Sequence, residues 1–484
     1  MKKLTDILKN TPVREVCGDT AAAIGGLVYD SRAVKPGDCF FAVPGTQSDG
    51  HDYIPIAVEK GAAAIVCERM PADAAEGVAY VLVGDSAGAM ADMAAAFYDY
   101  PSRELKLVGI TGTNGKTTTA TLLYDLVRAM GYKAGLISTV VYKIDGREVE
   151  ATHTTPDSIR LNAMMREMAD AGCAYCFMEC SSHAIVQERT RGLDFAGGIF
   201  SNITHDHLDY HKTFAEYIRA KKLFFDGLPK GAFALTNADD RNGRVMVQNT
   251  AAAVSAYSLR AMADFRCKIV EMHLDGMLLR IDGQELWVGL LGRFNAYNLL
   301  AVYGAAALLG LNRGEVLRVL SMLHAVSGRF EKIRAANGTT AIVDYAHTPD
   351  ALENVIQTIE EIRTPGQQLI VVCGCGGDRD RTKRPEMAAI AVKYATTAVF
   401  TSDNPRHESP EAILDDMVAG LEPGARYLRI ADRAEAIRTA VMLSRPGDII
   451  LVAGKGHETY QIVGDVKHPF DDREDIKKRF ALLN

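Results

Sequence analysis

Short apolar runs bounded by turn residues recur through the first hundred residues and predict a set of β-strands. These runs are Gly26–Tyr29, Cys39–Val43, Ala62–Cys67 and Tyr80–Val83. A stretch with helical spacing, Ala87–Tyr98, follows them. Pro101 disfavours helix in the residue before it, and a new apolar run begins at Leu105. We therefore predict a first α/β domain over residues 1–103.

From Leu105 onward, apolar runs alternate regularly with helical segments. The runs include Ala134–Ile137, Tyr175–Met178, Gly198–Phe200 and Met277–Ile281, and the helical segments include Thr117–Met130, Asn295–Leu309 and Arg313–Leu323. Such alternation predicts parallel βαβ units and a second domain over residues 104–330. Further runs at Thr340–Asp344, Gln368–Cys373, Ala398–Thr401 and Asp448–Ala453 predict a third α/β domain over residues 331–484.

The composition excludes several classes of protein. The 484 residues contain 54 Lys and Arg against 61 Asp and Glu, a net charge of −7, and 48% of them are hydrophobic. This composition is globular, and its acidic balance argues against nucleic-acid binding, which needs a basic surface. No apolar run approaches the roughly 20 residues that cross a bilayer, so we expect no membrane insertion. The longest run, around Leu299–Leu311, predicts a buried helix.

The N-terminus and the cysteines favour a cytoplasmic protein. Asp6 and Lys9 interrupt the apolar stretch that a signal peptide would need. Nine cysteines are too few for a disulfide scaffold. The C-x-x-C at Cys173 and Cys176 has no distant matching pair, so we interpret these thiols as packing residues rather than zinc ligands. We expect a cytoplasmic monomer.

The segment around residue 112 runs from an apolar strand through a glycine-rich loop into a helix. Gly112 and Gly115 allow backbone N–H groups to face phosphate oxygens, and the helix N-terminus adds the positive end of its dipole. Lys116, which we expect on an exposed loop, adds a cation, and Thr117 adds a hydroxyl for magnesium. The strict G-x-x-x-x-G-K-[ST] pattern fails at its first glycine. We predict a variant triphosphate-binding loop; the alternative is a glycine turn with a chance Gly-Lys-Thr.

Acidic residues and histidines follow two later strands. Glu179 comes directly after Tyr175–Met178, so its carboxylate emerges at a strand end and could reach magnesium on the phosphates. The segment Asn202–His211 contains three histidines and two aspartates. This density favours a metal or phosphate role. The alternatives are that Glu179 is a surface glutamate and that the histidines are buried core residues.

The glycine-rich segment Gly374–Asp378 resembles a dinucleotide-binding fingerprint only superficially. Arg379 stands where the third glycine belongs, so we reject a nicotinamide cofactor site. Arg379 suits a ligand rich in carboxylates. The alternative is a solvated charge within Asp378–Arg381.

Six motifs occur in an order that resembles the Mur ligases. They are Gly112–Thr118, Met178–His183, Asn202–His211, Gly328–Glu331, Asp344–Pro349 and Ala453–Glu458. The resemblance implies an N-terminal α/β UDP-binding domain, a central P-loop ATPase-like domain with a mostly parallel sheet, and a C-terminal Rossmann-like domain. It also implies ATP-dependent amide-bond formation in peptidoglycan precursor assembly. Within the family, Asp403–Arg406 is similar to the mark of the member that adds meso-diaminopimelate to UDP-N-acetylmuramoyl-L-alanyl-D-glutamate.

The resemblance also implies roles for residues around ATP and magnesium. The residues implied to bind ATP are Gly112, Thr113, Asn114, Gly115, Lys116, Thr117, Thr118, Asn298, Arg329 and Asp344. The implied magnesium ligands are Thr117, Glu179, His207 and Lys221 as a carbamate formed with CO2. The implied catalytic residues are Lys116, Glu179, His207 and Lys221. Without the resemblance, Lys221 would be interpreted as a helical lysine with a buried stem and a solvated charge.

Two further groups of residues are implied to bind the other substrates. Those implied for the UDP-N-acetylmuramoyl dipeptide are Ser31, Thr46, Gln47, Ser48, His153, Thr154, Thr155, Ser181, Gln187 and Arg189. Those implied for meso-diaminopimelate are Arg379, Asp403, Asn404, Pro405, Arg406, Gly454 and Glu458, with Glu458 expected to meet the distal ammonium. The sequence departs from the family pattern at Thr46, where we expect His, and at His153, where relatives often carry Asn.

The chemistry of amide formation is consistent with these residues. A carboxylate must be activated before an amine attacks it, and phosphoryl transfer from ATP does so by forming an acyl phosphate. Magnesium and Lys116 would neutralise the anionic groups that meet there. The alternatives within enzymes are an L-lysine-adding ligase and a folylpolyglutamate-synthase-like ligase. A regulatory nucleotide switch is the alternative from another class. The chain lacks the Asn-Lys-x-Asp guanine signature of such switches, and Thr236–Asp239 imitates it only faintly.

Overall fold

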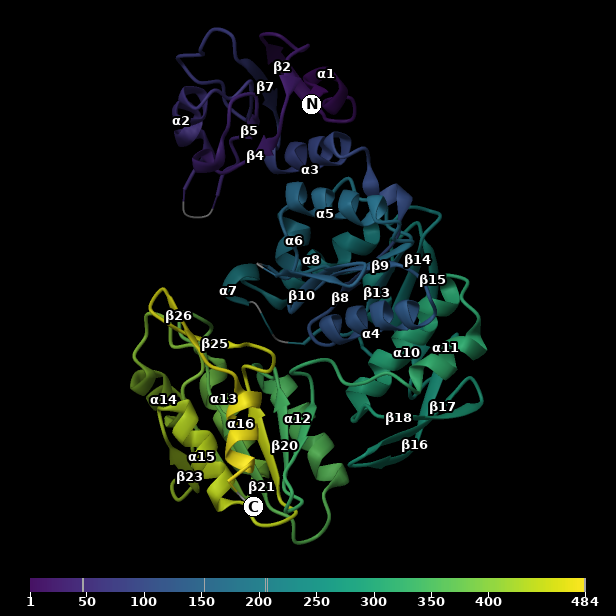
Figure 1. Ribbon diagram of the computed structural model, residues 1–484, viewed down its shortest axis with the longest axis vertical. Coiled ribbons are helices and arrows are strands. Elements are labelled where there is room, and N and C mark those ends of the chain that lie inside the picture. The colour runs from purple at the N-terminus through teal and green to yellow at the C-terminus, as the bar shows by residue number, and fades with distance from the viewer. Residues whose placement is uncertain (46–47, 152, 205, 207, 483–484) are drawn as a thin grey trace.

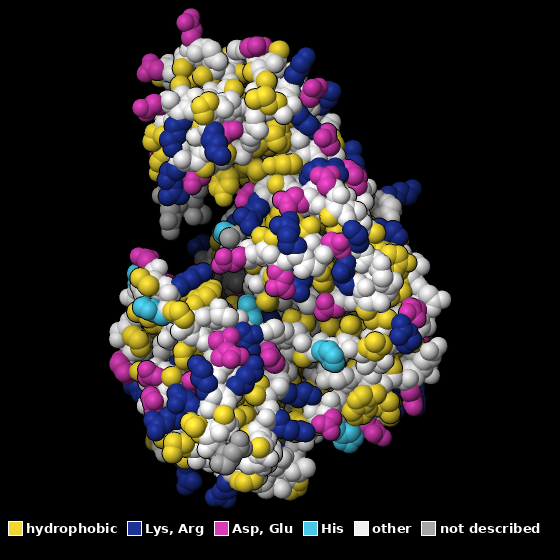
Figure 2. Space-filling view, viewed as in Figure 1, with side chains coloured by type: hydrophobic (Ala, Val, Ile, Leu, Met, Phe, Trp, Pro, Cys, Tyr) yellow, Lys and Arg dark blue, Asp and Glu magenta, His cyan; other side chains and the backbone are white. Residues whose placement is uncertain are grey.

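Three separate main sheets, each with its own helices, follow one another along the long axis of the molecule (Figure 1). The computed structural model describes residues 1–45, 48–151, 153–204, 206 and 208–482. The two termini lie in the outer domains at opposite ends of Figure 1. In Figure 2 the surface is hollowed on the side where the three domains face one another. This architecture confirms the predicted three-domain α/β class.

The N-terminal domain is built on a five-stranded sheet in the order β2-β7-β6-β5-β4. Its strands are β2 (Val13–Cys17), β4 (Leu27–Val28), β5 (Cys39–Phe41), β6 (Ala64–Cys67) and β7 (Ala79–Val83), with β1 (Lys2–Lys3) and β3 (Ala23–Ile24) paired separately. Its helices are α1 (Leu4–Ile7), α2 (Ile54–Glu59) and α3 (Ser86–Phe97), with short 3-10 turns at Ser31–Ala33, Gly50–Tyr53 and Pro101–Glu104. The apolar pattern does not predict the antiparallel edge strand β2, because the exposed Arg14 and Glu15 interrupt it.

The central domain contains an eleven-stranded sheet in the order β11-β10-β9-β12-β8-β13-β14-β15-β16-β17-β18. The bounds are β8 (Lys106–Thr111), β9 (Ala134–Ile137), β10 (Val141–Ile144), β11 (Arg147–Glu150), β12 (Tyr175–Glu179), β13 (Gly197–Phe200), β14 (Phe233–Asn237), β15 (Ala253–Ser258), β16 (Phe265–His273), β17 (Gly276–Ile281) and β18 (Gln284–Val288). In the spatial order of the sheet, the six neighbouring pairs between β9 and β16 are parallel. The strands β10 and β11 at one edge and β17 and β18 at the other pair antiparallel. The sheet is therefore mostly parallel, as predicted.

Helices cover both faces of the central sheet (Figure 1). They are α4 (Lys116–Ala129), α5 (Ser158–Asp170), α6 (Ser182–Val186), α7 (Leu208–His211), α8 (Phe214–Asp226), α9 (Gly243–Met246), α10 (Arg293–Leu308) and α11 (Arg313–Leu320). Helix α10 is buried along almost its whole length, which confirms the prediction from the longest apolar run. It packs against α4 and so closes the core beside the first turn of that helix.

The parallel register brings three chain segments to one edge of the central sheet. Strand β8 lies between β12 and β13, with Glu179 opposite Ile110 and Phe200 opposite Thr111. The segments after these strands therefore leave the sheet side by side. Ligand sites form at this edge in open α/β sheets.

The C-terminal domain is a six-stranded sheet in the order β19-β20-β24-β21-β22-β23. The bounds are β19 (Glu331–Arg334), β20 (Thr340–Asp344), β21 (Leu369–Cys373), β22 (Thr397–Phe400), β23 (Tyr427–Arg429) and β24 (Ile449–Ala453), and β25 (Tyr460–Val463) pairs with β26 (Val466–Pro469) in a separate hairpin. Its helices are α12 (Pro349–Ile362), α13 (Lys383–Tyr394), α14 (Pro410–Val418), α15 (Arg433–Leu443) and α16 (Asp472–Phe480). The strands from β20 to β23 are parallel, so their carboxyl ends again share one edge.

Candidate active site

A cleft of about 560 Å³ lies where the central and C-terminal domains meet. The central domain lines it with the segment Thr113–Thr118 and with Glu179 at the end of β12. The C-terminal domain lines it with Asp344–His347, which follows β20, and with Asp350 in the first turn of α12. Both domains thus contribute the carboxyl ends of parallel strands to one cleft.

The phosphate loop between β8 and α4 depends on two glycines. Gly112 and Gly115 have φ angles of +150° and +86°. A β-carbon at Gly112 would collide with Ser201 Oγ, and one at Gly115 would collide with the Asn298 side chain. Asn114 N donates to Asn202 Oδ1 at 2.9 Å, which ties the loop to the segment after β13. The N-terminus of α4 therefore opens into the cleft with its positive dipole end, as phosphate binding requires.

Lys116 is the first residue of α4 and is half-buried, so the expectation of an exposed loop position is wrong. Its Nζ donates to the carbonyl oxygens of Gly112 and Thr113, both at 2.9 Å. Burial lowers the pKa of Lys116, and the nearby Glu179 carboxylate opposes this shift. Lys116 is less exposed than expected because the segments after β12 and β13 pack against the loop in the tertiary structure.

Two of the predicted magnesium ligands, Thr117 and Glu179, line the same cleft. Glu179 is 1% exposed, and its two carboxylate oxygens accept from Thr139 N at 2.7 Å and Thr139 Oγ1 at 3.2 Å. Thr117 Oγ1 accepts from Arg329 Nη2 at 3.0 Å. His207 lies outside the described residues. A carboxylate and a hydroxyl beside a phosphate loop are oxygen donors of the kind that magnesium prefers, so the residues fit that ion.

Lys221 lies in α8 and is 1% exposed. Its Nζ donates to Gly112 O at 2.7 Å, behind the phosphate loop. A buried stem with a solvated charge is therefore wrong for this lysine. Burial and the positive charge of Lys116 lower the pKa of Lys221 well below its usual value. Within the part of the chain that the structure describes, no group of three or more His, Cys, Asp and Glu could hold a metal ion.

Asn298, Arg329 and Asp344 line the cleft around the phosphate loop. Asn298 Oδ1 accepts from Thr119 Oγ1 at 3.4 Å, which joins α10 to α4. The Arg329 guanidinium lies 4.7 Å from the centroid of the Tyr345 ring. Burial raises the pKa of Asp344 to about 6, although Arg329 opposes the shift. The structure thus brings these three residues together from distant parts of the sequence.

Most residues implied for the dipeptide form one hydrogen-bonded group beside Glu179. Thr155 Oγ1 donates to Glu179 O at 2.7 Å, and Arg189 Nη1 donates to Thr155 O at 2.7 Å. Arg189 Nη2 donates to Gln187 Oε1 at 2.6 Å. In the same group, Ser181 N donates to Thr155 Oγ1, Thr139 Oγ1 donates to Thr154 Oγ1, and Tyr142 OH donates to the His153 carbonyl.

Of the residues implied for the UDP end, Ser31 and Ser48 are described, and both lie in the N-terminal domain. Ser31 is buried at the start of a 3-10 turn, and Ser48 is exposed. Thr46 and Gln47 lie outside the described residues. Among the described residues, the structure therefore brings the dipeptide group to Glu179, at the cleft that the phosphate loop lines.

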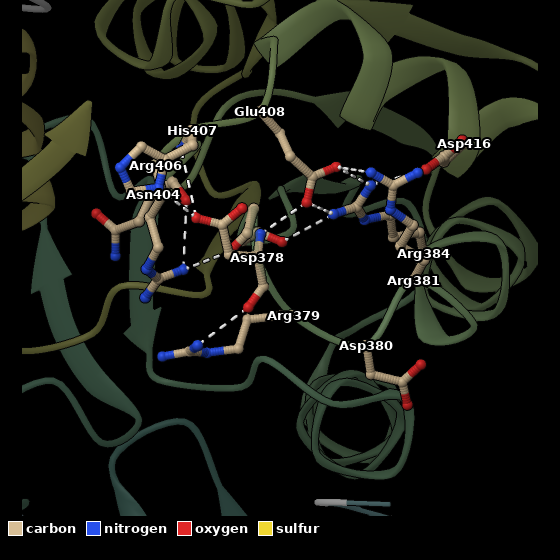
Figure 3. A network of polar contacts seen from close by, with 12 residues as sticks. Asp378, Arg379, Asp380, Arg381, Arg384, Asn404, Arg406, His407, Glu408 and Asp416 are labelled. Carbon is tan, nitrogen blue, oxygen red and sulfur yellow. Dashed lines mark hydrogen bonds and ion pairs between the residues drawn. The ribbon is translucent and has the colours of Figure 1, made fainter. Parts of the chain in front are cut away.

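The residues implied for the amino acid lie on three segments of the C-terminal domain, which follow β21, β22 and β24, and Figure 3 shows residues of the first two. Arg379 is on the loop after β21, and Asp403–Arg406 follows β22. Arg406 Nη1 donates to Gly377 O at 2.8 Å, and Gly377 N donates to Asn404 O at 2.9 Å. Burial and the proximity of Arg379 lower the pKa of Arg406. Two arginines therefore lie near enough for their positive charges to repel each other.

Asn404 and Glu458 are held by a buried lysine that sequence reasoning did not single out. Lys455 is 0% exposed, and its Nζ donates to Asn404 Oδ1 at 3.0 Å and to Glu458 Oε2 at 2.8 Å. Asn404 Nδ2 donates to the same Glu458 oxygen at 2.8 Å. Gly454 has a φ of +114°, and a β-carbon there would collide with the Asp403 carboxylate. Glu458 thus has an internal cation, in addition to the distal ammonium expected for it.

Comparison with known proteins identifies the family. The Mur ligase family catalytic domain matches residues 23–98, the middle domain residues 110–306, and the glutamate ligase domain residues 328–456. The UDP-N-acetylmuramoyl-L-alanyl-D-glutamate--2,6-diaminopimelate ligase of Phocaeicola vulgatus is 55% identical over 481 residues, 99% of each chain. The chain belongs to the Mur ligase family. The Bacteroides fragilis enzyme of the same name is also 55% identical, over 482 residues and 99% of each chain.

A solved structure agrees with this membership. The Mur ligase chain resembles the structure of a UDP-N-acetylmuramoyl-L-alanyl-D-glutamate--2,6-diaminopimelate ligase with 31% identity and a TM-score of 0.71. The match covers 100% of this chain and 99% of the other. Among the described residues, no helix of this Mur ligase is long and apolar enough to span a bilayer.

Sequence reasoning missed several residues of the Mur ligase cleft. Asp350 Oδ2 accepts from Asn114 Nδ2 at 2.9 Å, so the C-terminal domain contacts the phosphate loop directly. Tyr297 OH donates to Asp239 Oδ2 at 2.8 Å, and both residues line the cleft. Asp350 directly follows the quoted segment Asp344–Pro349, and this position was the one available signal for it.

Proposed function

We propose that this Mur ligase adds meso-diaminopimelate to the D-glutamate γ-carboxylate of UDP-N-acetylmuramoyl-L-alanyl-D-glutamate, with ATP as co-substrate. The observation that carries the proposal is the single cleft in which the phosphate loop and Glu179 meet residues of the C-terminal domain. The names of relatives 55% identical over 99% of the chain support the same substrates. The reaction belongs to peptidoglycan precursor synthesis.

The proposed reaction has two steps. The substrate γ-carboxylate attacks the γ-phosphorus of ATP, and the bond from this phosphorus to the β-γ bridging oxygen breaks. ADP departs, and the substrate becomes an acyl phosphate. The amine of diaminopimelate then attacks the acyl carbon, loses a proton, and expels inorganic phosphate as the amide forms. Lys116 and the N-terminal amides of α4 offset the charge on the transferring phosphoryl group.

Thr117 and Glu179 would hold magnesium, and His207 and a carbamate on Lys221 are the further ligands that we propose. When bound, this ion would supply a Lewis acid for the phosphoryl oxygens. The low pKa of Lys221 favours the neutral amine that must react with CO2 to form the carbamate. Thr139 orients the Glu179 carboxylate by contacting both of its oxygens.

We further propose that the domains over residues 1–103, 104–330 and 331–484 bind the UDP end, ATP and diaminopimelate, respectively. The positions of the three main sheets support these boundaries. Ser31 and the segment 46–48 would meet the UDP end, while the group around Thr155 and Arg189 would hold the dipeptide beside Glu179.

Substrate-dependent phosphate release tests the proposed function. A ligase should release phosphate from ATP at a substantial rate only when the UDP-dipeptide and meso-diaminopimelate are both present. The product should gain the mass of diaminopimelate less one water. A regulatory nucleotide switch would hydrolyse ATP without either substrate, and that result would contradict the proposal.

Arg406 should make the enzyme select diaminopimelate over lysine. Meso-diaminopimelate has a second carboxylate that lysine lacks, and an arginine offers two parallel N–H donors to such a group. Lysine would leave Arg406 unpaired and bring a further cation close to it. We expect the wild-type kcat/KM for diaminopimelate to exceed that for L-lysine by roughly a thousandfold, and Arg406→Ala to remove most of this preference.

Steady-state kinetics with the two amino acids check this expectation. Arg381→Ala is the matched control, because Arg381 lies on the neighbouring loop but pairs with Glu408 at 2.8 Å. It should change the preference less than Arg406→Ala does. Equal use of lysine by the wild type, or an unchanged ratio in Arg406→Ala, would contradict the assignment.

A further inference from the structure

Two loops of the C-terminal domain, the first after β21 and the second after β22, are joined at the proposed amino-acid site. Glu408 forms part of the connection (Figure 3). The Glu408 side chain lies at the end of the second loop, just before α14. Its Oε1 accepts from Asp378 N on the first loop at 2.6 Å. Asp378 directly precedes Arg379, one of the two arginines at the site. The Glu408 carboxylate is therefore one of the contacts that hold the backbone carrying Arg379, together with the contacts of Gly377 N with Asn404 O and of His407 with Asp378.

The same carboxylate is held by two arginines on its other side. Arg384 is 0% exposed and donates to both Glu408 oxygens, at 2.9 Å and 3.0 Å, while Arg381 donates to Oε2 at 2.8 Å. Arg384 Nη2 also donates to Gly376 O at 3.2 Å, which fixes a second point of the first loop. These charges lower the pKa of Glu408 to about 2, so the carboxylate stays ionised at neutral pH.

The first loop in turn holds Arg406. Gly377 O accepts from Arg406 Nη1, and the backbone of Arg406 has a left-handed φ of +51°. Its amide donates to Ile462 O at 3.1 Å, and its carbonyl accepts from Gly464 N at 2.8 Å. Both side-chain contacts of Arg406 use Nη1, so Nε and Nη2 have no hydrogen-bond partner among the described residues. A planar guanidinium presented in this way depends on the position of Gly377.

We propose that Glu408 is a positioning residue for the incoming amino acid, because it fixes the loop that carries Arg379 and supplies the Gly377 carbonyl that orients Arg406. The inference rests on the proposed function, since it assigns these arginines to the distal carboxylate of diaminopimelate. Glu408 acts through the loop and does not touch the substrate. Two cations that repel each other need such an anchor to stay in one geometry before the anionic group arrives.

Glu408→Gln tests this role, because it keeps the size of the side chain and removes its charge. The pairing with Arg384 weakens, and the amide of Asp378 loses a charged acceptor. We expect the KM for meso-diaminopimelate to rise on the order of tenfold to a hundredfold. The KM values for ATP and for the UDP-dipeptide should change less than about twofold, and the preference over lysine should fall.

Asp416→Asn is the matched control. Asp416 pairs with the same Arg384 through Nη1 at 2.7 Å, but among the described residues it has no hydrogen bond with the loop after β21. If Glu408 only compensates the charge of Arg384, both variants should lose thermal stability and neither should change the KM for diaminopimelate selectively. That result, or an equal rise of all three KM values in Glu408→Gln, would overturn the proposal.

Two further readouts separate the remaining outcomes. If Glu408→Gln does not fold, Glu408→Asp is measured by the same criterion, since it keeps the charge and withdraws the acceptor by one methylene; an unchanged KM for diaminopimelate would then overturn the proposal. A wild-type protein that releases no phosphate with diaminopimelate would instead contradict the proposed function. Wild-type activity with an unaffected Glu408 variant would contradict the positioning role alone.

Discussion

Lys116→Ala is expected to abolish ligation, with a fall in kcat of at least about a thousandfold. Lys116 lines the cleft at the N-terminus of α4, directly after the phosphate loop, where we expect the transferring phosphoryl group to bind. Its Nζ already lies over the phosphate loop, held by the carbonyl oxygens of Gly112 and Thr113. The rate of substrate-dependent phosphate release measures this effect.

The fold should survive the same substitution. Lys116 has no ion pair with a carboxylate among the described residues, and burial disfavours its charge, so its removal should cost little stability. Lys106→Ala, at the other end of β8, is the matched control and should retain activity, because Lys106 lies at the exposed start of the strand. A Lys116→Ala protein that loses thermal stability but still ligates would refute the prediction.

Lys221→Ala is the second variant for which we expect nearly complete loss of activity. As a carbamate, this residue would present an anionic oxygen near the phosphate loop, and alanine removes that oxygen. Short-chain carboxylic acids such as formate or acetate should partly restore activity, because a carboxylate can occupy the space of the missing group. The measurement is ligation rate against acid concentration in the variant and in the wild type.

Two controls separate carbamylation from packing. Lys222→Ala removes the neighbouring lysine of α8, which pairs with Asp226 at 2.5 Å, and it should retain activity and show no rescue. Removal of bicarbonate and CO2 should lower the activity of the wild type. If bicarbonate depletion has no effect and no acid rescues Lys221→Ala, the carbamate should be dropped, and Lys221 would be a buried donor to the phosphate loop alone.

The unit around the phosphate loop could be predicted from the sequence because its signals are local. An apolar run, two glycines and a helical pattern lie within the few residues around 112, and the structure has β8, the loop and α4 there. Glu179 was likewise placed at a strand end by the apolar run before it. Strand and helix periodicity depend on neighbouring residues, so the sequence by itself determined the α/β class and the parallel arrangement around this loop.

Contacts between distant segments were decided only by the tertiary structure. Lys221 donates to Gly112, which is 109 residues away, and Asp350 accepts from Asn114 across 236 residues. No periodic pattern encodes which loops meet, because that depends on strand order and on how the domains pack. The same reason explains the half-burial of Lys116. From the sequence, Glu408 is indistinguishable from a surface glutamate. Only the packing of two loops against the buried Arg384 positions it beside the proposed amino-acid site.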